Sequence, residues 1–150
     1  MTLTNQMDLL YATIDETSGM YRRKEVSPVE VMKATLERLY EVEPQLNAFI
    51  TVLAEASLVE AKQAEEIFRK GEAAGKLTGI PLSLKDIFST KGIRTTMGSR
   101  ILKDFVPEED AYVYTALREA GAILFGKTKC WSLPLDSFIL ITGRLIIRGT

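Results

Sequence analysis

The chain has 150 residues, of which 46% are hydrophobic and 26% charged, a composition typical of a globular protein. Its 19 basic and 20 acidic residues nearly cancel, which gives no sign of direct nucleic-acid binding or of a basic membrane-binding patch. Histidine is absent, which excludes serine–histidine and cysteine–histidine catalysis within this chain and every metal site that requires histidine. We expect no metal and no organic cofactor.

The single cysteine, Cys130, cannot form an internal disulfide, and this favours a reducing compartment. Residues 1–16 lack the basic start and the apolar stretch of a signal peptide. No segment approaches the length needed to span a bilayer. We therefore expect a cytoplasmic protein that does not enter a membrane.

Helices are predicted first along the chain. A helix over about residues 7–23 is expected, with Gly19 near its end. The next helix starts with the capping box of Ser27 and Glu30 and has proline at its first position. We expect Pro44 to end it.

An alanine-rich helix is expected over residues 55–70, after a short strand or turn at residues 47–53. Helical spacing places one set of apolar side chains on its inward face. This set consists of Ala56, Val59, Ala64, Ile67 and Phe68.

The pattern then changes to that of an α/β unit. Residues 77–86 alternate in the manner of a strand, with proline near its start. Residues 91–100 form a glycine-containing loop. Asp110 is expected to cap a helix that runs to residue 120, with Gly121 as its C-cap and Val113, Ala116 and Leu117 inward. The apolar run at residues 122–125 is typical of a buried parallel strand.

Lys85, at the end of the first of these strands, is the candidate catalytic residue. A surface lysine at a strand end is the simpler interpretation of the pattern alone. The alternative is a lysine that a buried strand delivers to a pocket. Burial disfavours the ammonium form, so such an amine can act as a base near neutral pH and activate a serine without histidine.

Two neighbouring features are interpreted structurally. Asp86 is expected to point to the opposite face from Lys85 and to hold the following loop through backbone N–H groups. Gly126, Lys127 and Thr128 are similar to the end of a phosphate-binding loop. The first glycine of that motif is missing, because residues 121–125 form the apolar strand, so nucleotide binding is not predicted.

The segment Gly79-Ile80-Pro81-Leu82-Ser83-Leu84-Lys85-Asp86 closely resembles a motif of the amidase signature family. Residues 90–99, 110–128 and the helical region 27–50 resemble the same family, so the likeness covers roughly residues 5–128. It implies an α/β fold: N-terminal helices followed by the start of the mixed, mainly parallel sheet of the amidase signature fold, truncated.

The resemblance also implies chemistry. Family members cleave carboxamides with a nucleophilic serine, a second serine in a cis peptide and a lysine, and that lysine maps onto Lys85. The two serines belong to a Gly/Ser-rich segment that this chain does not contain. The expected partner of the complete enzyme is a small amide substrate, and the 150-residue chain is expected to be inactive.

Two other functions remain open. The same family includes the A subunit of aspartyl/glutamyl-tRNA amidotransferase, and the N-terminal half resembles both groups. The chain as given could also be a non-catalytic helical interaction module. Either way, incomplete strands are expected to leave sheet edges through which the protein could associate with itself, and we expect marginal stability.

Residues 129–150 form a separate tail with no family pattern and no helical or strand periodicity. Loss of one base from an Asn codon at position 129 would explain it. Restoring that base allows the family-like sequence N-M-L-E-F-A and, further on, H-P-D-Y-G-Q-T-N-N-P-W-D, which is more typical of general amidases. The alternative is a short tail that docks on a partner. In a frameshifted tail, exposed Trp131, Phe138, Ile139, Leu140 and Ile141 would favour aggregation.

Overall fold

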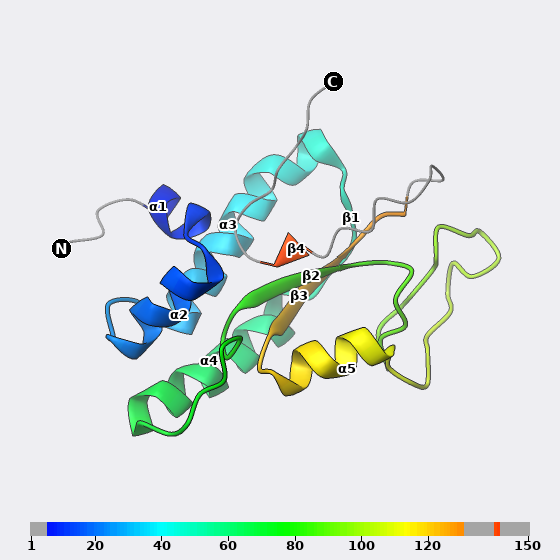
Figure 1. The fold of residues 1–150 in the computed structure, drawn as a ribbon. Coiled ribbons are helices and arrows are strands. Elements are labelled where there is room, and N and C mark those ends of the chain that lie inside the picture. Colours follow the sequence, from blue (N-terminus) through cyan, green and yellow to red (C-terminus); the bar gives the residue numbers. More distant parts are fainter. Residues whose placement is uncertain (1–5, 131–139, 142–150) are drawn as a thin grey trace.

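The computed structural model describes residues 6–130 and 140–141, and it contains a mixed sheet with helices on both faces (Figure 1). Helices α1 and α2 lie at one end of the molecule, and a long loop extends from the other end, where β2 and β3 finish. Helix α3 runs between these two ends, since the residues that follow it pair with the end of β3. Within the described part, no helix is both long and apolar enough to cross a membrane.

The helix expected over residues 7–23 is instead two helices, α1 (Gln6–Tyr11) and α2 (Ile14–Arg22). The break has a local cause that the sequence contained. Thr13 is the N-cap of α2 and accepts a hydrogen bond from the backbone of Glu16, whose carboxylate accepts one from the Thr13 backbone. This second capping box starts a new helix where a continuous one was predicted.

Helix α3 (Pro28–Leu46) begins as predicted, with the reciprocal bonds of Ser27 and Glu30. The prediction that Pro44 ends the helix is wrong, because Pro44 lies inside its last turn. The helix ends at Asn47, which adopts a left-handed conformation at φ 48°. The Glu43 carboxylate then accepts hydrogen bonds from the backbone of Ala48 and Phe49, which leads the chain into the first strand.

Helix α4 (Ala54–Lys70) follows the short strand β1 (Phe49–Val52), as expected. Its buried face agrees with the predicted one at Ala64 but not at Val59, which is 55% exposed, and Ser57 and Ala61 are buried instead. These small residues face α3 and allow the two helices to approach closely.

Two further strands and one helix complete the described fold, namely β2 (Pro81–Lys85), α5 (Tyr112–Glu119) and β3 (Ile123–Thr128). The expected cap by Asp110 is not formed. Ala111 is the N-cap of α5, and no side chain caps it. Asp110 accepts a hydrogen bond from the backbone of Lys91 at 2.6 Å and pairs with Arg118 at 3.0 Å, so it fastens the loop to the helix.

The inward face of α5 also differs from the predicted one. Tyr114 is the buried residue of this helix, whereas Ala116 is exposed. Leu117 packs partly buried against the same apolar cluster as Tyr114. The larger ring of Tyr114, rather than the small Ala116, therefore fills the space between α5 and the sheet.

The described strands follow the order β1-β3-β2-β4, where β4 is Leu140–Ile141. β2 and β3 are parallel, as predicted, whereas β1 pairs with β3 and β4 pairs with β2 in antiparallel fashion. β3 is therefore a central strand rather than the exposed edge that was expected around Ile123. The outer side of β2 is paired with β4 at Leu82 and Ser83, so part of the tail, expected to lack strand character, joins the sheet. Trp131, Phe138 and Ile139 lie outside the described residues.

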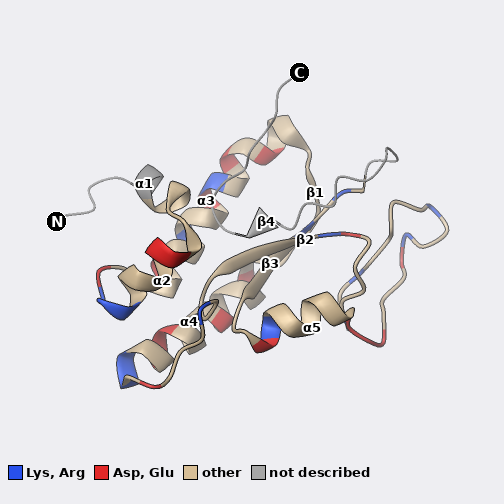
Figure 2. Cartoon of the chain, viewed as in Figure 1, with Lys and Arg blue, Asp and Glu red and all other residues tan. Residues whose placement is uncertain are grey.

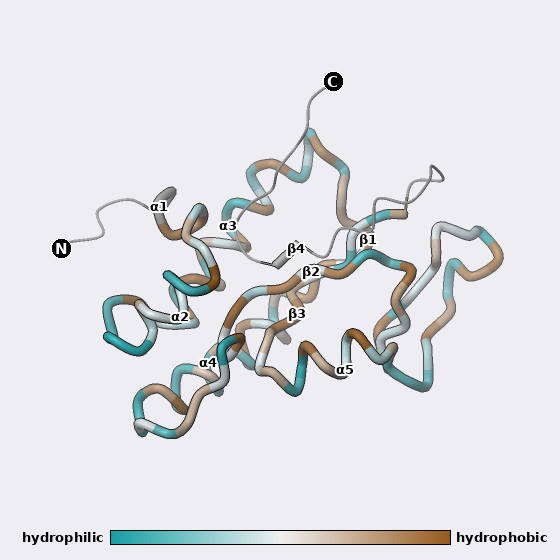
Figure 3. Tube along the Cα trace, viewed as in Figure 1, coloured by the Kyte–Doolittle hydropathy of each residue, from teal (hydrophilic) through white to brown (hydrophobic). Residues whose placement is uncertain are grey.

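Hydrophobic residues are concentrated along β2 and β3 (Figure 3), and apolar clusters on both faces of the sheet form the core. On one face, Ile123 and Phe125 pack with α3 and α4. On the other, Leu82, Leu84 and Leu124 pack with Tyr114 of α5. Pro81 through Leu84 of β2 are all buried, because helices cover both faces of the sheet.

Candidate active site

Lys85 is the last residue of β2 and is partly exposed. Its register partner in β3 is Thr128, so the two strands end together. The carboxyl ends of parallel strands are where open α/β sheets place their ligand sites. The structure thus puts the predicted catalytic residue at the end of the sheet where a site is expected. Figure 2 shows the positive and negative residues that follow one another there.

Asp86 is fully buried and holds the loop, as predicted. Its Oδ2 atom accepts hydrogen bonds from the backbone N–H of Thr96 at 2.8 Å and from the Thr96 hydroxyl at 2.6 Å. Its backbone carbonyl accepts a third bond from the N–H of Met97. Asp86 therefore closes residues 86–97 into a ring that starts directly after Lys85.

A second lysine, Lys127, lies inside this ring with none of its side chain exposed. Its Nζ atom donates to the carbonyl of Phe88 at 2.9 Å, to the hydroxyl of Thr90 at 3.0 Å and to the hydroxyl of Thr95. Its distance to Oδ1 of Asp86 is 3.3 Å. This carboxylate oxygen accepts no hydrogen bond within the described residues, so its main electrostatic partner is the Lys127 ammonium.

The hydroxyl protons indicate the charge state of Lys127. The Thr95 hydroxyl donates its proton to the Ile93 carbonyl at 3.1 Å, so it can only accept from Lys127. The Phe88 carbonyl is an acceptor as well. A lysine ammonium has three N–H groups, which match the three acceptors Phe88, Thr90 and Thr95, and its positive charge matches the Asp86 carboxylate of the ion pair. Burial lowers the pKa of Lys127, and the charge of Asp86 and its contact with the amine oppose that change.

The sequence analysis missed Lys127, and the sheet register explains why. The pairing shifts by one residue between Leu82, which faces Leu124, and Ser83, which faces Gly126. This irregularity places Leu84 opposite Lys127. Leu124 and Lys127 therefore lie on the same face although they are three residues apart. Regular alternation would have put them on opposite faces.

The same register separates the two lysines. Lys127 lies on the face of Leu84 and Asp86, beneath the loop that follows β2. Lys85 alternates with Leu84 and therefore points to the opposite face. One signal in the sequence could have indicated Lys127, namely a charged residue that directly continues a buried apolar strand.

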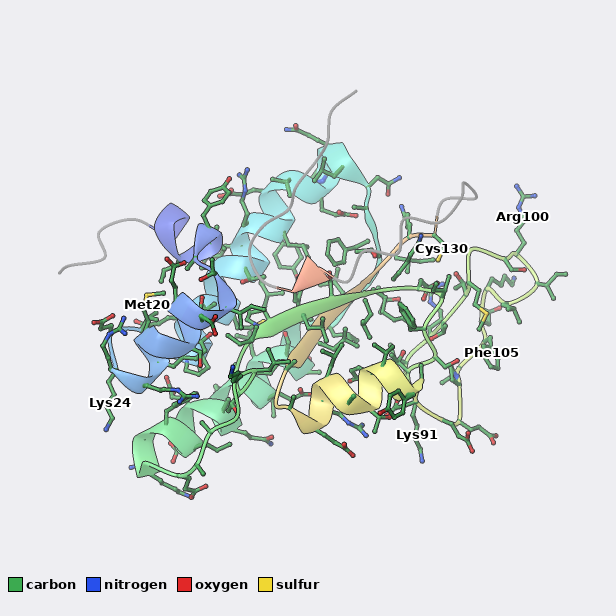
Figure 4. The ribbon with its side chains drawn as sticks, in the orientation of Figure 1. Met20, Lys24, Lys91, Arg100, Phe105 and Cys130 are labelled. Atoms are coloured by element: carbon green, nitrogen blue, oxygen red, sulfur yellow. The ribbon has the colours of Figure 1, made fainter. Side chains whose placement is uncertain are left out.

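An open depression of about 520 Å³ lies beside this loop. Its lining includes Thr96, a member of the Asp86 ring, and Cys130, which follows β3. Burial and the nearby Asp86 carboxylate raise the pKa of the Cys130 thiol, so it is a poor nucleophile here. Figure 4 shows Cys130 at the end of β3 and Arg100 directed outward from the loop. The remaining lining residues are Ile50, Arg94, Gly98, Ser99, Arg100, Lys103 and Lys129.

Comparison with known proteins places this arrangement in a family. The family model described as Amidase matches residues 30–137. The A subunit of glutamyl-tRNA(Gln) amidotransferase from Geobacter sp. (strain M21) is 49% identical over 121 residues, covering 81% of this chain and 25% of its own. The corresponding protein of Carboxydothermus hydrogenoformans is 42% identical over 134 residues, covering 89% of this chain and 27% of its own.

Solved structures of amidases resemble this chain as well. The peptide amidase of Stenotrophomonas maltophilia superposes with a TM-score of 0.75 and 31% identity, covering 81% of this chain and 25% of that one. An amidase family protein from Bacillus anthracis str. Ames superposes with a TM-score of 0.74 and 28% identity, covering 82% of this chain and 25% of that one. The chain thus spans about a quarter of the length of these proteins. Their shared segment includes the β2–loop–β3 unit that carries Lys85, and the chain belongs to the amidase signature family.

Proposed function

We propose that residues 1–128 are the N-terminal part of an amidase domain that hydrolyses carboxamides, and that Lys85 is its catalytic base. One observation carries the proposal: Lys85 ends a parallel strand at the carboxyl edge of the sheet, beside a loop organised by buried polar groups. Family membership supplies the reaction class, because the motif around Lys85 is the family's lysine motif.

In the proposed reaction, the neutral Lys85 amine takes a proton from a bridging serine, which in turn takes one from the nucleophilic serine. The nucleophile attacks the amide carbonyl, and the protonated Lys85 returns its proton through the bridging serine to the departing nitrogen. The C–N bond then breaks, which leaves an acyl-enzyme and a neutral lysine. Water then releases the acid, and backbone N–H groups stabilise the oxyanion. Neither serine of this relay is assigned in the chain, so the 150-residue protein is proposed to be inactive by itself.

A second candidate is the A subunit of an aspartyl/glutamyl-tRNA amidotransferase. The names of the curated relatives favour it, since several that are 41–49% identical are subunits of this kind. The solved neighbours include a peptide amidase and an aryl acylamidase, which favours a general amidase. Both candidates cleave an amide C–N bond and both use the same lysine motif, so they share the proposed role of Lys85.

The first experiment measures ammonia release from simple carboxamides by the 150-residue chain. We expect no turnover above background. A second experiment joins residues 1–128 to the downstream part of the Geobacter sp. (strain M21) relative. We expect this chimera to release ammonia, and Lys85→Ala to abolish the release because the base is lost. Lys33→Ala is the matched control, because Lys33 is an exposed lysine of α3.

Two results would contradict the proposal. One is turnover by the 150-residue chain that disappears in Lys85→Ala, since the chain would then hold a complete site. The other is a Lys85→Ala chimera as active as the parent chimera. Acceptance of glutamine alone, among the carboxamides tested, would favour the amidotransferase candidate over a general amidase.

We further propose that the tail after Thr128 arose by loss of one base from an Asn codon at position 129. The DNA that follows the Thr150 codon tests this directly. In the restored frame, it is expected to encode a segment rich in glycine and serine that supplies the two missing serines. Coding DNA of close relatives that maintains the present frame through residue 150 would contradict the loss.

A further inference from the structure

Lys127 is a fully buried amine for which the proposed reaction has no use. A buried ion pair gives little net stability, because desolvation of the two charges offsets their attraction. Apolar residues of similar size would often serve equally well in a purely structural role. The contacts of Lys127 therefore suggest a more specific task.

These contacts come from one short segment. Asp86, Phe88, Thr90 and Thr95 all present acceptors to the same Nζ atom, and all belong to the loop that follows β2. Hydrogen bonds within the loop link some of its residues, since Asp86 accepts from Thr96 and the Thr90 and Thr95 hydroxyls lie 3.3 Å apart. Lys127 adds contacts with four loop residues from the neighbouring strand β3, so the cation contributes to the path of the loop.

The loop is joined directly to Lys85. The N–H of Phe88 donates to the Lys85 carbonyl at 3.1 Å, and the N–H of Asp86 donates to the Thr128 carbonyl at 2.9 Å. Asp86 and Phe88, which follow the end of β2, thus both contact Lys127. Any movement of Lys127 would be transmitted to the backbone of Lys85 through the adjacent Asp86 or through the Phe88–Lys85 hydrogen bond.

Lys127 cannot replace Lys85 as a base. Its donors are occupied, it has no exposed surface, and it lies on the opposite face of the sheet. Its influence must pass through the backbone. We propose that the buried Asp86–Lys127 pair is a positioning device that fixes the backbone and thereby the side-chain environment of Lys85. The proposal rests on the proposed function in one respect, namely that Lys85 acts as the catalytic base.

Acetylation kinetics of individual lysines in the 150-residue chain test the proposal. Trace acetic anhydride is applied between pH 6 and 10, and mass spectrometry measures each lysine relative to exposed Lys33. In the folded wild-type chain, we expect Lys127 to react at least about tenfold more slowly than Lys33, because it must be exposed by local opening. The acetylation rate of Lys85 relative to Lys33 is expected to differ between the folded chain and the chain in urea, because the loop beside Lys85 is formed only in the folded chain.

The decisive variant is Thr95→Val, which removes one acceptor of Lys127 without leaving a buried charge unpaired. We expect it to move the Lys85 rate, relative to Lys33, toward the urea value, and Thr95→Ser, which keeps the hydroxyl, to restore it. Thr35→Val is the matched control. Thr35 is also a buried threonine, but its hydroxyl bonds to Val31 within α3, so the relative rate of Lys85 should not change.

Several results would overturn the proposal. They are an unchanged relative acetylation rate of Lys85 in folded Thr95→Val, an equal change in Thr35→Val, or acetylation of Lys127 as fast as that of Lys33. Global unfolding of Thr95→Val would also count against it, since the cluster would then support the whole sheet rather than the Lys85 backbone. The measurement reports the environment of Lys85 and not turnover, so an inactive chain leaves its result valid.

Discussion

The Nζ atom of Lys127 lies 3.3 Å from Oδ1 of Asp86, and neither side chain is exposed to solvent. The two residues come from adjacent parallel strands, one at the end of β3 and one just after β2. Each also binds the loop between residues 88 and 96, so a single buried pair ties two strands and one loop together.

Removal of one member of this pair is expected to be strongly destabilising. Lys127→Met leaves the Asp86 carboxylate buried without a cation, which should lower the free energy of unfolding by about 3–5 kcal/mol. Asp86→Asn together with Lys127→Met should cost less than the sum of the single changes, since neither charge is then left alone. Urea unfolding of the four proteins gives the coupling energy, and strictly additive values would contradict the pairing.

Close packing of β1 on β3 should make Gly126 intolerant of a side chain. A Cβ atom there would lie 2.8 Å from the Phe49 ring and 2.9 Å from the Thr51 carbonyl. Gly126→Ala is expected to lower the free energy of unfolding by about 1–3 kcal/mol. Adding Phe49→Leu should recover only part of this loss, because the Thr51 carbonyl is a backbone group that no substitution removes. A Gly126→Ala chain with the wild-type urea midpoint would disprove this packing.

Tyr21 should make the chain less stable at high pH. Burial raises its pKa above the ordinary value of 10.0, and its hydroxyl donates to the Gly79 carbonyl at 3.1 Å. Above pH 10, the unfolded chain releases the tyrosine proton while the folded chain retains it. The folded state then binds more protons, so the free energy of unfolding falls as pH rises.

Tyr21→Phe isolates this effect. At neutral pH, loss of the hydrogen bond should lower the free energy of unfolding by about 0.5–1.5 kcal/mol. The difference in free energy of unfolding from wild type should shrink as pH rises above 10. Urea unfolding at several pH values measures both curves. Tyr40→Phe is the control, because Tyr40 is 57% exposed, and its curve should run parallel to wild type. A constant difference for Tyr21→Phe would contradict the assignment.

The outer side of β1 is unpaired within the described residues, and we propose that it permits self-association. One side chain partly blocks it, because Arg94 donates to the Ile50 carbonyl at 2.9 Å. Arg94→Ala should therefore increase association in sedimentation equilibrium, whereas Arg38→Ala on α3 should not. A wild-type monomer at all concentrations with a sharp thermal transition would argue against both the association and the expected marginal stability.

The sequence by itself determined the local elements and the candidate base. The capping box at Ser27 fixed the start of α3, and the apolar run after Gly121 identified a buried parallel strand. The motif around Lys85 indicated both the family and the end of β2. These signals are local, because a cap or an apolar run acts through neighbouring residues, and so they can be recognised without a fold.

Only the tertiary structure determined what surrounds Lys85. The one-residue shift between β2 and β3 placed Lys127 beneath the loop, and no periodicity within β3 encodes that shift. Likewise, Asp110 could have capped α5, but the approach of the loop gave it the Lys91 backbone and Arg118 instead. In both cases, a polar group had several possible partners of similar strength. The assembled sheet determined which of these partners lay within hydrogen-bonding distance once water was excluded.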